Sequence, residues 1–283
     1  MSNKQHLLVL DPIAFAGGSK IATENILRNV DTNQVRITVV TRDSDSWKWD
    51  GLKHSPLFEL KSLTSREQGI GYFLRHITIV FSLLWARLKH GRIDIALGAS
   101  GPGVDLALYL TRLILNFDIV QLVHGPVAKS RTIGRCLRNA GAVFFLESTR
   151  DTVKSALETV VSGDEAQQLM AMPHYQVMTN GLPESQWPST SRQHAPRIFW
   201  AASLLKWKGL DLLLESLQLM SDEHRPTTNI CYIRPKETAL AVSKADVKLA
   251  HVRWYESPHD LDAIRASSSI FVEASRMRLK CPI

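Results

Sequence analysis

The stretch Ile198-Phe-Trp-Ala-Ala-Ser-Leu-Leu-Lys-Trp-Lys-Gly-Leu-Asp-Leu-Leu-Leu-Glu-Ser-Leu217 decides the fold that the sequence predicts. It opens on an apolar run, Ile198 to Ala202, which is typical of a buried strand. A short loop then ends at Lys208 and Gly209. Leucines follow at helical spacing, at Leu210, Leu213, Leu214 and Leu217. The pattern predicts a strand, a tight loop and a helix in succession.

Lys208 stands where this helix begins. Free backbone N–H groups and the positive end of the helix dipole meet at such a position, which therefore binds anions, phosphate above all. A plain turn between strand and helix with a solvated lysine explains the same local pattern. The stretch alone thus leaves both a phosphate-binding loop and a structural turn open.

The rest of the first 181 residues alternates between short apolar runs and helical patterns. We predict strands at 6–11, 35–41, 57–60, 93–98, 119–123, 142–146 and 175–178, and helices at 21–30, 70–89, 104–115 and 149–159. In the first helix, Ile21, Ile26, Leu27 and Val30 are expected to face inward. Such alternation is typical of α/β proteins with a parallel sheet and helices on both faces.

Residues 182–196 carry three prolines and little periodicity, which favours a linker. The alternation then restarts, with strands expected at 198–202, 229–233, 252–255 and 270–273 and helices at 210–220, 237–244 and 261–266. The length of 283 residues fits about two domains. We therefore expect a first lobe over 1–181, a linker over 182–196 and a second lobe over 197–283.

The run from Ser203 to Leu213 resembles the G-R-L-x-x-x-K-G-x-D-x-L-L signature of the GT-B-fold glycosyltransferases of family 4. Lys208, Gly209 and Asp211 match the signature, whereas Ala202 and Ser203 replace its Gly-Arg pair. In that family the Arg and the Lys hold the diphosphate of the nucleotide-sugar donor. The resemblance implies this role for Lys208 beside Gly209, with one of the two phosphate cations missing.

The resemblance also implies an architecture and a reaction. Two Rossmann-like lobes of the GT-B type are expected. The family transfers a sugar from a nucleotide-diphosphate donor to a hydroxyl, with retention and without a metal or another cofactor. Its acceptors are saccharides or lipid-linked molecules in the synthesis of polysaccharide, lipopolysaccharide or glycolipid.

Two further segments match the family in the first lobe. Gly17 and Gly18 follow the first predicted strand, where bare glycines let a backbone approach a ligand closely. They resemble the Gly-Gly loop that faces the donor phosphates, and Lys20 could add charge there. His124 ends a hydrophobic strand, at the edge of the sheet where ligands of α/β proteins bind. The family carries a histidine at this strand end beside the transferred sugar, which implies a catalytic-site role for His124.

The end of the chain departs from the family. Ile270 to Arg276 resembles the strand that leads to the E-x7-E motif, but neither glutamate follows before Ile283. We therefore expect an incomplete second lobe. A truncated, inactive remnant that keeps the fold and at most binds nucleotide is the alternative to an active transferase. A nucleotide-dependent oxidoreductase is the third interpretation, but this sequence lacks the G-x-G-x-x-G fingerprint of that class.

Charge and composition bear on location and partners. Residues 61–140 hold eleven Lys and Arg against four acidic residues, which accounts for the whole net charge of +7. A basic face of this kind suits an anionic membrane or plain solvent, and no motif for nucleic acid is visible. Three cysteines without a CxxC pair fit a reducing compartment and disfavour a disulfide framework or zinc site.

No signal peptide is expected before the first strand, so the sequence predicts a cytoplasmic protein. Its most apolar segment, 77–86, is too short to span a bilayer, which takes about 20 residues. We expect the helix that contains it to be mostly buried. Peripheral attachment to the inner face of a membrane is the second interpretation.

Overall fold

A computed structural model describes residues 4–13, 17–42, 44, 47, 49, 51–58, 69–181, 197–205, 208–233 and 249–274. The chain divides into two compact units, Met1–Pro183 and Glu184–Ile283. The predicted linker at 182–196, the predicted helix at 237–244 and the tail from residue 275 lie outside the described residues.

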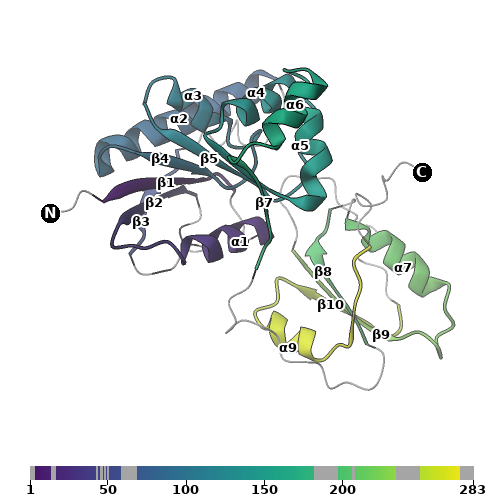
Figure 1. Ribbon diagram of the computed structural model, residues 1–283. Helices are drawn as coiled ribbons and strands as arrows, with labels where there is room; N and C mark the ends of the chain where they lie inside the picture. The colour runs from purple at the N-terminus through teal and green to yellow at the C-terminus, as the bar shows by residue number, and fades with distance from the viewer. Residues whose placement is uncertain are drawn as a thin grey trace. The chain divides into compact units, whose positions relative to one another are not determined.

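The first unit contains a parallel sheet of seven described strands in the order β3-β2-β1-β4-β5-β6-β7 (Figure 1). The strands are β1 (Gln5–Asp11), β2 (Val35–Thr41), β3 (Lys53–Pro56), β4 (Ile95–Gly98), β5 (Asp118–Val123), β6 (Ala142–Leu146) and β7 (Tyr175–Met178). The helices are α1 (Gly18–Leu27), α2 (Ile70–His90), α3 (Leu106–Arg112), α4 (Arg131–Asn139), α5 (Arg150–Leu157) and α6 (Gly163–Met170), with a short 3-10 turn η2 (Glu147–Thr149) before α5.

Both faces of this sheet are covered, because side chains alternate along each strand. Leu8 and Leu10 of β1 pack with α2 and α3, whereas Val9 packs with Leu27 of α1 and with Trp47. Figure 1 shows α2 to α6 along one face and α1 along the other. The expected α/β class with helices on both faces of a parallel sheet is confirmed for this unit.

The second unit contains a parallel sheet of four described strands in the order β10-β9-β8-β11. They are β8 (Arg197–Ser203), β9 (Thr227–Ile233), β10 (Val252–Glu256) and β11 (Ile270–Phe271), with helices α7 (Leu210–Gln218) and α9 (Leu261–Ala266). Trp200 and Ile230 pack with the leucines of α7. On the other face, the Asn229 side-chain amide donates to Ser268 after α9 at 3.0 Å. The strand, loop and helix predicted from residues 198–217 are present.

Several local predictions are wrong. The third strand is Lys53–Pro56, and Leu57 and Phe58 of the predicted strand at 57–60 lie outside it, whereas 59–60 fall outside the described residues. Helices α4 and α6 have no counterpart in the predicted set, since both are short and largely polar. Helix α1 starts at Gly18, and its buried residues are Lys20, Thr23 and Leu27, whereas Ile21 and Ile26 are 48% and 42% exposed. The buried polar contacts described below determine which side of α1 faces the sheet.

Helix α2 reverses the expected burial. His76 and Ser82 are buried with Ile79, Leu83 and Ala86. Large apolar side chains point to solvent instead, with exposed fractions of 80% at Ile70, 57% at Phe73, 61% at Phe81, 48% at Trp85 and 78% at Leu88. The prediction of a mostly buried helix is therefore wrong. A helix that is apolar on most sides carries no sequence signal for which side packs against the sheet.

Candidate functional site

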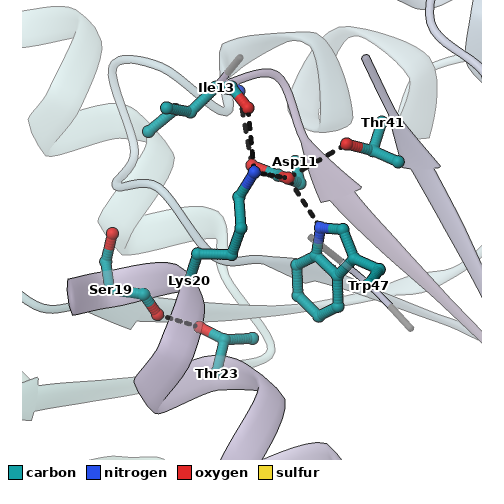
Figure 2. A network of polar contacts seen from close by, with 7 residues as sticks. All are labelled: Asp11, Ile13, Ser19, Lys20, Thr23, Thr41 and Trp47. Atoms are coloured by element: carbon teal, nitrogen blue, oxygen red, sulfur yellow. Dashed lines mark hydrogen bonds and ion pairs between the residues drawn. The ribbon is translucent and has the colours of Figure 1, made fainter. Parts of the chain in front are cut away.

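The loop after β1 is organised by the buried carboxylate of Asp11 (Figure 2). Its Oδ2 atom accepts hydrogen bonds from Trp47 Nε1 at 2.7 Å and from Thr41 Oγ1 at 3.0 Å. The Lys20 ammonium lies 2.9 Å from the same oxygen, and both side chains are about 5% exposed or less. Lys20 also donates to the carbonyl of Ile13 at 3.1 Å. Lys20 therefore ties the start of α1 to the end of β1.

Gly17 and Gly18 stand at the N-terminus of α1. Gly17 is extended, with φ −135° and ψ 163°, and Gly18 is the first helical residue. A side chain at Gly18 would meet no atom within 4 Å. In the described part of the chain, α1 has no side-chain cap and no acidic residue in its first turn. No described side chain therefore accepts from the first N–H groups of α1.

His124 follows the last residue of β5, and its Nε2 atom lies 3.2 Å from the Thr23 hydroxyl of α1. That hydroxyl donates its proton to the carbonyl of Ser19 at 2.8 Å. The Thr23 oxygen can then accept only from an Nε2–H group, which assigns the proton of the neutral ring to Nε2 and leaves Nδ1 as an acceptor. The first lobe thus brings His124 beside the same helix that carries Gly17, Gly18 and Lys20.

Burial lowers the pKa of His124, and the nearby Asn180 side chain partly offsets this by raising it. The Nδ1 atom is buried and makes no hydrogen bond of normal geometry with the described residues. At neutral pH the ring is therefore uncharged. A neutral imidazole in this position can accept a hydrogen bond from a hydroxyl group of a ligand.

The second lobe carries Lys208 and Gly209 immediately before α7. The Lys208 N–H donates to the Leu205 carbonyl at 2.9 Å, which forms a tight turn. Gly209 has φ +69°, and a Cβ atom there would lie 1.8 Å from the carbonyl oxygen of Ala274. Only glycine fits both conditions. Gly209 therefore allows this turn, and the turn places Lys208 at the positive end of α7.

Ser203, the last residue of β8, stands where the family signature has arginine. Its carbonyl accepts from the Leu205 N–H at 2.7 Å, so its backbone belongs to the same turn as Lys208. Its side chain is an uncharged hydroxyl. The charge that an arginine would bring to this turn is absent at residue 203.

The structure adds three residues that the sequence analysis does not name as part of the site: Asp11, Thr23 and Trp47. The sequence held one signal for the Asp11–Lys20 pair. A carboxylate ends an apolar strand, and a lysine follows nine residues later. No local signal marks Thr23, because its contact with His124 joins residues 101 positions apart.

No family model and no curated protein matches this sequence. Solved structures do match, at low identity. A lipopolysaccharide outer core galactosyltransferase has a TM-score of 0.56 and 13% identity, over 96% of this chain and 74% of that chain. The catalytic domain of starch synthase IV from Arabidopsis thaliana has a TM-score of 0.63 and 12% identity, over 97% of this chain and 78% of that chain.

A trehalose-6-phosphate synthase, solved in work on glycosyl transfer with retention, has a TM-score of 0.65 and 11% identity, over 95% of this chain and 78% of that chain. Identities this low speak for the fold rather than the chemistry. With the two parallel sheets and their covering helices, they show that this chain has the fold of two Rossmann-like lobes found in GT-B glycosyltransferases.

Proposed function

We propose that this protein is a family 4-type glycosyltransferase. It would transfer a sugar from a nucleotide-diphosphate sugar to a hydroxyl of a saccharide or lipid-linked acceptor. Retention of the anomeric configuration and independence of metal ions belong to the same proposal. The reaction needs cations and helix N-termini that stabilise the departing diphosphate, while the anomeric carbon gains positive charge.

The observation that carries this proposal is the turn from β8 into α7. Lys208 lies at the start of a nine-residue helix, directly before a glycine that the backbone of Ala274 requires. A lysine beside a helix N-terminus combines a full charge with the partial positive charge of the dipole. In the first lobe, the N-terminus of α1 at Gly17 and Gly18 would supply a second anion-binding turn.

His124 would sit beside the transferred sugar. Its neutral ring, held through Nε2 by Thr23, presents Nδ1 as an acceptor for a sugar hydroxyl. Lys20 would act through its position rather than by direct contact, because Asp11 and the Ile13 carbonyl already bind its ammonium group.

Binding of a nucleotide without turnover is the second candidate, and Ser203 favours it. One charge-assisted contact is worth about 1.5–3 kcal/mol, so its loss would weaken the hold on the diphosphate. The fold and the Lys208 turn would remain in such a protein. The two candidates differ in whether nucleotide diphosphate is released.

We expect the purified chain to release nucleotide diphosphate from one member of a panel of UDP-, GDP- and ADP-sugars, and to do so equally in EDTA. NMR of the product is expected to show the anomeric configuration of the donor. Binding without release would establish the second candidate. Loss of release in EDTA would contradict metal independence, and an inverted product would contradict retention.

We also propose that α2 attaches the protein to an anionic membrane surface. Within the described residues, no helix has the length and hydropathy to cross a bilayer. The exposed apolar side chains of α2 instead suit the boundary between headgroups and acyl chains. They lie within the sequence region 61–140, which carries the whole positive charge excess.

Phe81→Glu is expected to weaken flotation with vesicles that contain phosphatidylglycerol by about 10-fold or more, since burying a phenylalanine contributes about 1.5–3 kcal/mol. Leu219→Glu, at a 90% exposed leucine of the second unit, is the matched control and should bind as the wild type does. High salt should weaken binding of all three proteins. Equal flotation of Phe81→Glu and wild type would contradict the assignment to α2.

A further inference from the structure

A separate pocket of about 470 Å³ opens in the first lobe where β4 and β5 end. Its walls come from the start of α2, the loop after β4, the loop after β5 and the start of α4. None of the described residues that line it is acidic. Gly17, Gly18 and Lys20 do not line it either, so it is distinct from the anion-binding turn at α1.

His76 of α2 is the most unusual residue of this pocket. Its side chain lines the pocket, yet the residue is only 1% exposed. Neither ring nitrogen has a hydrogen-bond partner among the described residues. Buried polar groups in native proteins are nearly always hydrogen-bonded, so a histidine without a partner points to a ligand that supplies one.

The Tyr72 ring packs against one side of the His76 ring. Tyr72, one turn earlier on α2, donates its hydroxyl proton to the Gly103 carbonyl at 2.6 Å. The Tyr72 and His76 rings meet edge to face with centroids 4.4 Å apart. Burial lowers the pKa of His76 to about 4, so at neutral pH the ring both donates and accepts hydrogen bonds. Such a ring suits a hydroxyl group of a ligand.

Positive charge lies next to this histidine. Arg75 lines the pocket and is half-buried, and it has no ion-pair partner among the residues that the structure describes. Across the pocket, Ser130 and Thr132 mark the N-terminus of the nine-residue helix α4. The Ser130 hydroxyl caps the Ile133 N–H, and no acidic residue stands in the first turn. A guanidinium and a helix N-terminus together favour an oxyanion.

We propose that this pocket binds the phosphate group of a hydroxylated second substrate, with the phosphate between Arg75 and the N-terminus of α4 and a hydroxyl at His76. Val104, Val127 and Ile133 supply an apolar wall for the ring or chain that joins the two groups. The identification of this molecule as the sugar acceptor rests on the proposed transferase function. The binding of a phosphate ester does not.

The test is a calorimetric titration of the full chain with glucose 6-phosphate, glucose and inorganic phosphate. Glucose 6-phosphate is expected to bind best, because it alone offers both groups. Arg75→Gln should weaken its binding about 10-fold or more, as expected for the loss of a charge-assisted contact. Lys89→Gln removes an exposed charge from the far end of the same helix and should leave this affinity unchanged.

A second variant addresses the buried histidine. His76→Phe keeps an aromatic ring but cannot form hydrogen bonds, so it should weaken glucose 6-phosphate while leaving inorganic phosphate unaffected. The proposal is overturned if Arg75→Gln binds as Lys89→Gln does. It is also overturned if UDP displaces glucose 6-phosphate and Lys208→Ala abolishes its binding, because the probe would then occupy the donor turn.

Two further comparisons are needed. One distinguishes a lipid phosphate from a free phosphate ester, and the other distinguishes failure of the pocket proposal from failure of the proposed transferase function. Competition by vesicles of phosphatidylcholine with phosphatidic acid, but not by phosphatidylcholine alone, would assign the pocket to a lipid headgroup. Binding of soluble glucose 6-phosphate without such competition would assign it to a free phosphate ester. Phosphate-ester binding without any nucleotide binding would refute the proposed function and support the proposed pocket. Nucleotide binding without phosphate-ester binding would refute the pocket and support the proposed function.

Discussion

Replacing Asp11 with alanine is expected to destabilise the first lobe by about 3–5 kcal/mol, the usual effect of removing one partner from a buried ion pair. The variant removes the Asp11 carboxylate from its contact with the Lys20 ammonium, which is 5% exposed. It also leaves the indole N–H of the buried Trp47 without an acceptor. Native-state hydrogen exchange of the β1 and β2 amides measures this loss in the lobe concerned.

Two controls make this expectation specific. Arg138→Ala breaks an exposed ion pair with Glu165 at 3.3 Å, whose side chains are about half exposed, and should cost about 1 kcal/mol or less. Lys20→Met combined with Asp11→Ala should recover part of the loss, because the double variant removes both charges of the buried pair. An Asp11→Ala protein as stable as Arg138→Ala, or a double variant no more stable than Asp11→Ala, would contradict the network of Figure 2.

The sheet strands were the most predictable part of the molecule. The bounds of β2 (Val35–Thr41), β6 (Ala142–Leu146) and β7 (Tyr175–Met178) agree with the predicted strands at both ends. Strands of a parallel sheet are buried on both faces, so they appear in the sequence as short, nearly continuous apolar runs between turn residues. The two Rossmann-like sheets follow from the alternation of such runs with helices.

The orientation of the helices was not predictable. In α1, the buried carboxylate of Asp11 draws Lys20 inward, and Ile21 then turns to solvent. In α2, the small residues Gly71, Ser82 and Ala86 face the protein, whereas Phe73, Phe81 and Trp85 face outward. Hydrophobic periodicity shows which positions of a helix are apolar. It does not show which of these positions a neighbouring helix can approach closely.

The candidate site also has one part that the sequence predicts and another part that it does not. The turn at Lys208 and Gly209 was predictable because its chemistry lies within a few consecutive residues. The contacts of His124 with Thr23 and the pocket of Arg75 and His76 join residues from separate elements. Nothing in their local sequence distinguishes these side chains from ordinary helix residues, so only the fold reveals them.

Lys208→Ala is expected to weaken the binding of nucleotide diphosphates by about 10- to 100-fold, since a charge-assisted contact contributes about 1.5–3 kcal/mol. Lys208→Arg keeps the charge and should retain most of the affinity. Arg253→Ala, at an exposed position of β10 in the same lobe, removes a charge elsewhere and should bind as the wild type does. Because Lys208 is half-buried at a turn, amide spectra should confirm that each variant is folded.

The most direct test of the central claim is a titration of the wild-type chain and of Lys208→Ala with UDP, GDP and ADP, followed by calorimetry and by amide NMR. We predict that one of these nucleotides binds the wild type, shifts the amide signals of Gly209 and the first turn of α7, and binds Lys208→Ala at least about 10-fold more weakly. Equal affinity of the two proteins, or shifts that leave the start of α7 unchanged, would contradict the assignment of a donor diphosphate site to this turn.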